Sequence, residues 1–307
     1  MAARIPVGDT IEKIFVFSFG RYFTVLGIVW LPTLAILASV LPLMPLLAQV
    51  RPGPGFSLSA VLVAWMVLAD LFFFFAIVWM RVGVTKEILG LRKGSRFVYL
   101  PGMDELRVIG SYVLVYLLVY AAMIVAFLAM LLAGAILGVS LSTGIGPGIE
   151  KGNLPPALVG VFVLITVVFD IALIYSMIRA TWLITPVVVA DGRVRVTGSW
   201  ALLRGNVLRV LVIAFVALLP LLVAEMIFIF TVFMPMAMDM FVQHRAALPT
   251  TADAGFSQYA IWCVLAGTML VIMPLAVGLM SSPAAFAWRA LVPPPPPPVP
   301  VEQPVAQ

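Results

Sequence analysis

The chain has 307 residues, of which 64% are hydrophobic and only 10% are charged. Soluble domains carry roughly 25% charged residues, so this composition excludes an ordinary water-soluble protein. The formal net charge of +5 would suit a nucleic-acid partner. The basic residues, however, lie beside long apolar runs, so we expect membrane lipids with anionic headgroups as partners and no nucleic acid.

Residues 1–22 precede the apolar runs and predict a separate amphipathic element. One face carries residues at helical spacing, namely Ile11, Ile14, Phe15, Ser18, Phe19 and Tyr22. We interpret this segment as a cytoplasmic interfacial helix; the alternative is that it is only the start of a long first membrane helix. Asp9, Glu12 and the lack of a small-residue cleavage site argue against a signal peptide.

Six apolar runs follow, each close to or above the roughly 20 residues that cross a hydrocarbon core. They cover residues 23–48, 58–80, 109–138, 157–178, 208–234 and 259–281. These runs predict an all-α, polytopic transmembrane bundle of about six spans within one membrane domain, residues 23–291. The tail, residues 292–307, contains six consecutive prolines, which predict a disordered spacer rather than a ligand for a proline-binding partner.

The basic residues predict the orientation of the spans. Fifteen of the 18 Lys and Arg residues flank the runs on one side, which leaves Arg51, Lys151 and Arg245 for the other side. The positive-inside rule places the crowded side in the cytoplasm. Because the number of spans is even, we expect both termini in the cytoplasm.

Three carboxylates, Asp70, Asp170 and Glu225, lie inside the predicted spans. A charge at the bilayer centre costs at least ~2.5–3.5 kcal/mol on insertion scales, so such groups usually face the bundle interior or a wet cavity. One hypothesis is a proton or cation relay of a small transporter or channel, which convergence of the three in one cavity would favour. The other is that each carboxylate bonds to a neighbouring helix and fixes the packing.

Two of these aspartates also suggest a repeat. Asp70 and Asp170 lie 100 residues apart, and each precedes an arginine, Arg81 or Arg179, at the end of its span. A basic residue also precedes each odd-numbered span. We therefore hypothesise that the bundle consists of three repeated helical hairpins.

The most specific segment covers residues 181–215. A proline-containing apolar strip leads there to a turn and then to Ser-Trp-x-Leu-x-x-Gly-Asn before the fifth span. The positions are Pro186, Ser199, Trp200, Leu202, Gly205 and Asn206. This segment and the six-span layout resemble the glycerophosphoryl diester phosphodiesterase membrane-domain family and related bacterial six-span membrane proteins. The resemblance implies a bacterial inner membrane and no hydrolysis, because we expect no phosphodiesterase domain in these residues.

Within this segment we predict a short interfacial helix that anchors the connection between the fourth and fifth spans. Ser199 would cap the helix, Trp200 and Leu203 would share one side, and Arg204 would face headgroups.

No residue set predicts catalysis. The single Cys and the single His, His244, cannot assemble a recognisable metal, haem or iron–sulfur ligand set, and no nucleophile elbow or phosphate-binding loop is present. We expect no catalytic residue, metal or cofactor, and a non-enzymatic integral membrane protein that acts through lipid or protein contacts. Gly134 and Gly138 have the spacing of close helix contacts, within one chain or in a homo-oligomer.

Overall fold

The computed structural model describes residues 4–40, 42–43, 59–94, 97–136, 156–195, 197–235, 238 and 253–292, and its elements there are all helices. Six helices are long and apolar enough to cross a membrane. They are α2 (Tyr22–Val40), α4 (Ala60–Leu89), α5 (Met103–Ile136), α6 (Pro156–Thr181), α9 (Val207–Phe228) and α11 (Asp253–Leu291). The chain is therefore a multi-pass membrane protein, and the predicted all-α, six-span bundle is confirmed. Gly138 and His244 lie outside the described residues.

A separate helix, α1 (Val7–Gly20), precedes the first span and ends just before Arg21. It packs against α9 and α11 and buries Ile14, Phe17 and Ser18. Phe19, which the sequence pattern assigned to the apolar face, is 54% exposed, whereas Phe17 is 7% exposed. The predicted face was therefore partly wrong, because α1 lies against two protein helices rather than only on lipid, and its contact face is rotated accordingly.

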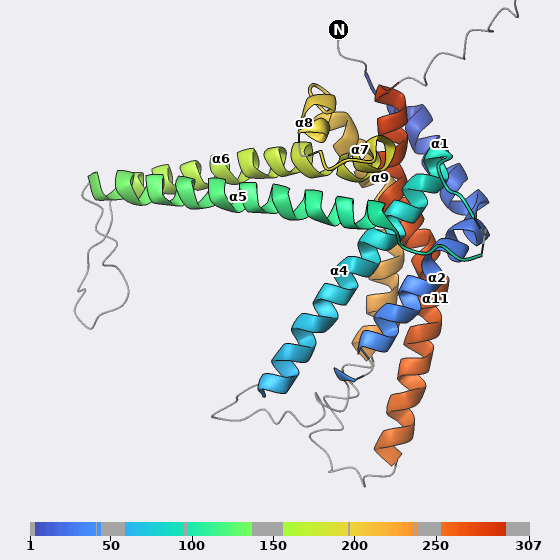
Figure 1. Cartoon of the computed structure of the whole chain (residues 1–307). Coiled ribbons are helices and arrows are strands. Elements are labelled where there is room, and N and C mark those ends of the chain that lie inside the picture. Colours follow the sequence, from blue (N-terminus) through green and yellow to red (C-terminus); the bar gives the residue numbers. More distant parts are fainter. Residues whose placement is uncertain are drawn as a thin grey trace, which may run out of the picture.

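The helices meet at one end of the molecule, which we call the head end. It comprises α1, the short helices α7 (Ile184–Asp191) and α8 (Gly198–Leu202), and the last turns of α4 and α11. The spans α2, α4, α9 and α11 lead away from it, and α11 is central because it packs against α1, α2, α4, α7 and α9 (Figure 1). The spans α5 and α6 run side by side in a different direction, and we call this pair the arm (Figure 1).

Helix α7 fills the centre of the head end, although the sequence pattern indicated only an apolar strip between two spans. Six of its residues are buried, Ile184 through Val189, and they pack against α4, α5 and α11. Pro186 is tolerated because it lies in the first turn, where backbone N–H groups have no partner within the helix. The short helix therefore links the arm to the four packed spans.

A second link lies in the loop between α4 and α5. The indole of Trp79 donates a hydrogen bond to the backbone oxygen of Tyr99 at 3.1 Å. The buried carboxylate of Glu105 accepts bonds from the Tyr99 hydroxyl and from the backbone N–H of Gly102, the latter at 2.6 Å. Burial, together with the hydrogen bond to Glu105 and its charge, raises the pKa of Tyr99. Glu105 therefore closes the first turn of α5 as the acidic partner of a capping box does.

Candidate functional site

The three carboxylates predicted from the sequence do not come together. Asp70 lies on α4, Asp170 on α6 of the arm and Glu225 on α9, and each residue is exposed. A pocket between α9 and α11 includes Glu225 and neither of the other two. A relay that joins all three carboxylates in one cavity has no support in this arrangement.

Ser199 joins two helices. Its hydroxyl accepts a hydrogen bond from the backbone N–H of Leu183 at 3.1 Å and donates one to the backbone oxygen of Arg179 at 2.7 Å. The prediction that Ser199 caps its own helix was wrong, because α8 begins at Gly198, two residues earlier than predicted, with Thr197 at the cap position and no side chain capping it. The hydroxyl instead bonds to backbone groups on both sides of the junction between α6 and α7.

The neighbouring motif residues also differ from their predicted arrangement. Trp200 is 41% exposed while Leu203 is fully buried, so the two residues do not share one side of α8. The Arg179 guanidinium nevertheless stacks over the Trp200 ring at 4.2 Å and donates to the Trp200 backbone oxygen at 2.9 Å. Leu202 packs partly buried against the core, and Arg204 is exposed.

The last two motif residues, Gly205 and Asn206, lie where the segment before α1 contacts the start of α9. Gly205 has a φ of 78°, a left-handed conformation that favours glycine and turns the chain into α9. The buried Asn206 then accepts a hydrogen bond from the backbone N–H of Ile5 at 3.2 Å, and Arg209 donates to the backbone oxygen of Ile5 at 3.1 Å. Ile5 is fully buried. The motif is therefore a scaffold that fixes the segment before α1.

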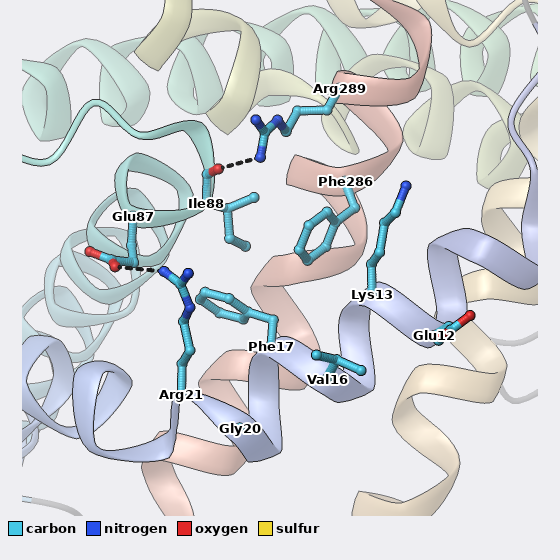
Figure 2. Close-up of a pocket in the computed structure, with 10 residues that line it drawn as sticks. All are labelled: Glu12, Lys13, Val16, Phe17, Gly20, Arg21, Glu87, Ile88, Phe286 and Arg289. Carbon is cyan, nitrogen blue, oxygen red and sulfur yellow. Dashed lines mark hydrogen bonds and ion pairs between the residues drawn. The ribbon is translucent and has the colours of Figure 1, made fainter.

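That scaffold positions α1 as one wall of a pocket at the head end, with α4 and α11 opposite (Figure 2). We call this cavity of about 540 Å³ the head pocket. Ten residues line it, namely Glu12, Lys13, Val16, Phe17, Gly20, Arg21, Glu87, Ile88, Phe286 and Arg289. Cations outnumber carboxylates in this list, and the remaining side chains are apolar.

One side of the head pocket is closed by an ion pair. Arg21 Nη1 lies 3.3 Å from Glu87 Oε1, and Arg92 Nη1 lies 3.4 Å from Glu87 Oε2. Arg21 is still 61% exposed at its side chain. A neighbouring cavity of about 520 Å³ lies beyond the pair, shares Arg21 and Glu87, and is also lined by Phe23 and Arg92. Two arginines around one carboxylate leave a net positive charge between the two cavities.

The other side carries two further cations. Arg289 Nη1 donates to the backbone oxygen of Ile88 at 2.9 Å, while Lys13 extends beside Phe286 (Figure 2). Lys13 is exposed, and no residue in the described part of the chain is seen to pair with it. Its ammonium is therefore available to a ligand.

The lining combines charge with an apolar wall. The rings of Phe17 and Phe286 meet edge to face, with centroids 6.0 Å apart. Lysine and arginine both bind phosphate oxygens, arginine through paired N–H groups. The pocket therefore suits a ligand with an anionic group and an apolar part.

Sequence reasoning missed this pocket although a signal was present. Lys13, Val16, Phe17, Gly20 and Arg21 follow the i, i+3, i+4, i+7, i+8 spacing of one helix face. The predicted amphipathic helix instead rests on the more apolar face that contains Ile11, Ile14 and Phe15. No local sequence pattern pairs Glu87 or Arg289 with residues of α1.

Within the described ranges, no group of three His, Cys, Asp or Glu side chains is placed to hold a metal ion. Comparisons with models of known protein families, with curated proteins and with solved structures found no match.

Proposed function

We propose that this multi-pass membrane protein is a non-enzymatic lipid-binding protein of a bacterial inner membrane. The head pocket binds the phosphate of an anionic lipid headgroup in the cytoplasmic leaflet. One observation carries the proposal: Lys13, Arg21 and Arg289 line the same cavity as the aromatic pair Phe17 and Phe286. The resemblance to the glycerophosphoryl diester phosphodiesterase membrane-domain family stays a prediction beside it.

The position of the pocket supports a lipid rather than a soluble anion. Val16, in its lining, is 65% exposed, and Phe23, in the lining of the neighbouring cavity, is 81% exposed. Phe23 lies in the first turn of the span α2, so an acyl chain can continue from a bound headgroup along that helix. A free phosphate would use the cations but not these apolar surfaces.

The charge distribution supports the cytoplasmic leaflet. The head end carries the ends of the spans that the positive-inside rule assigns to the cytoplasm. Anionic lipids of that leaflet attract each nearby Lys or Arg by about 1 kcal/mol. Lys13 is the cation of choice for a test, because its removal breaks no hydrogen bond or ion pair seen among the described residues.

The test uses the purified full-length protein in a neutral detergent. We expect short-chain phosphatidylglycerol to raise the thermal unfolding midpoint more than phosphatidylcholine or inorganic phosphate does. Lys13→Gln should weaken the phosphatidylglycerol affinity roughly fivefold, the equivalent of about 1 kcal/mol.

The matched control is Arg204→Gln, which removes one exposed cation from the head end outside the pocket. It should leave the affinity unchanged. Equal stabilisation by phosphatidylcholine, or equal weakening by the control, would contradict the proposal. An effect of inorganic phosphate as large as that of the lipid would show that the site takes a soluble anion.

A further inference from the structure

A third cavity lies apart from the head pocket and its neighbouring cavity, between α9 and α11. It has a volume of about 300 Å³ and is lined by Leu221, Ala224, Glu225, Phe228, Thr268, Met269, Ile272 and Met273. Glu225 is the single charged group among these residues. We call this cavity the Glu225 groove.

The groove lies toward the opposite end of its span from the head end. Glu225 follows Val207, the first residue of α9, by 18 residues, which is about 27 Å along a helix. A hydrocarbon core is ~30 Å thick, so Glu225 lies near the boundary of the other leaflet. The side chain is therefore within reach of a headgroup, while the rest of the groove faces the apolar layer.

Irregular helix geometry surrounds the groove. Pro220 directly precedes its lining residues on α9, and a π-helical segment, Ile229–Phe233, directly follows them. Pro274 follows Met273 on α11. Proline and π-helical turns interrupt the regular ladder of a helix, and π turns occur frequently at functional sites. Such interruptions therefore border the groove on both walls.

Among the described residues, the Glu225 carboxylate has no hydrogen-bond or ion-pair partner. Glu225 is also exposed. An isolated carboxylate in an apolar setting is unfavourable, and a bound cation offsets that cost.

We propose that the Glu225 groove binds a single-chain amphiphile whose polar end is a primary ammonium group. The ammonium provides one positive charge, which complements Glu225, the single charged residue of the lining, while the almost wholly apolar rest of the groove suits the chain. The volume is at the lower end of the roughly 300–1,000 Å³ of small-molecule sites, so it suits one chain rather than two. The flexible side chains Met269 and Met273 adapt to such a chain. This site has the opposite charge preference from the head pocket and does not depend on it.

The test places the full-length protein in phosphatidylcholine nanodiscs and titrates dodecylamine, dodecanol and dodecanoate separately at neutral pH. Dodecylamine should raise the thermal unfolding midpoint saturably, whereas the alcohol and the carboxylate of the same chain length should not. Glu225→Gln should weaken dodecylamine binding at least tenfold, and Glu225→Asp, which keeps the charge, should weaken it less.

The matched control is Asp170→Asn, which removes an exposed carboxylate from a span of the arm. It should bind dodecylamine as the unmodified protein does. Similar midpoint shifts with all three amphiphiles would overturn the proposal, because they would indicate general partitioning into the bilayer. Unchanged binding by Glu225→Gln, or equal loss in the control, would overturn it as well.

Discussion

The central helix α11 and the arm helix α6 are both apolar enough to span a membrane, yet they have opposite surroundings. In the most apolar stretch of each span, 56% of the residues are buried within the protein for α11, and none are for the span that contains α6. The two helices also present different side chains. The buried face of α11 carries the small residues Ser281, Ser282, Ala284 and Ala285. The arm presents large side chains such as Ile171, which is 62% exposed.

This comparison shows that apolarity decides which helices enter the membrane but not which helices pack on one another. Close approach needs small residues, since lipid competes equally well for large apolar ones. Gly278 illustrates the point, because an added Cβ there would lie 3.2 Å from the Ser18 hydroxyl oxygen of α1. The packed spans are therefore held by direct contacts with α11, whereas α7 and the α4–α5 loop link the arm to them.

The largest expected effect comes from filling a close contact among the packed spans. A Cβ at Gly83 of α4 would lie 2.5 Å from Ile28 Cγ2 and 2.9 Å from Tyr99 Cδ1. Gly83→Leu should destabilise the protein by about 3 kcal/mol, the upper end of overpacking costs. A thermal or denaturant unfolding series in detergent measures this effect.

The matched control lies on the arm. No atom within 4 Å would meet a Cβ at Gly110 of α5, so Gly110→Leu should leave stability unchanged or slightly raised. If both variants unfolded at the same midpoint, the contrast between packed spans and arm would be wrong.

The second effect concerns the anchor of α1. Asn206→Ala removes the acceptor of the buried Ile5 N–H and should cost about 2 kcal/mol. Hydrogen exchange should increase in α1 and remain unchanged in the distal part of α5. Uniform acceleration across both helices would show that the anchor does not act locally.

The smallest effect is a pH dependence at the junction with the arm. The pKa of Tyr99 is raised, so the neutral phenol stabilises the fold below the unfolded-state pKa of about 10, and this stabilisation is lost as the pH rises above it. Between about pH 10 and pH 11, stability should fall by roughly 1 kcal/mol more than in Tyr99→Phe. Parallel stability curves for the two proteins would contradict this assignment.

The comparison also explains how much of the structure the sequence could predict. The six spans follow from composition, because each apolar run exceeds the thickness of a hydrocarbon core. The distinction between the arm and the packed spans does not follow from composition, since the exposed Ile171 and the buried Val29 are equally apolar. Contacts such as that between Ile5 and Asn206 join residues 201 positions apart, and no local pattern encodes them.

For the candidate site, the sequence supplied residues but not their grouping. The motif residues Ser199 and Asn206 were singled out, and the structure shows which backbone groups they bond. The lipid partner was expected from the basic residues as a whole. Its proposed location required the tertiary packing that brings Lys13 and Arg289 into one cavity.

The most direct measurement of the central proposal is site-specific photo-crosslinking in nanodiscs that contain equal amounts of phosphatidylglycerol and phosphatidylcholine. A benzoylphenylalanine replaces either Val16, an exposed residue of the head pocket, or Ile171, which is similarly exposed on the arm. We predict that phosphatidylglycerol dominates the adducts at position 16, that Lys13→Gln removes this enrichment, and that position 171 captures both lipids equally. The same lipid ratio at both positions would contradict an anionic headgroup site in the head pocket.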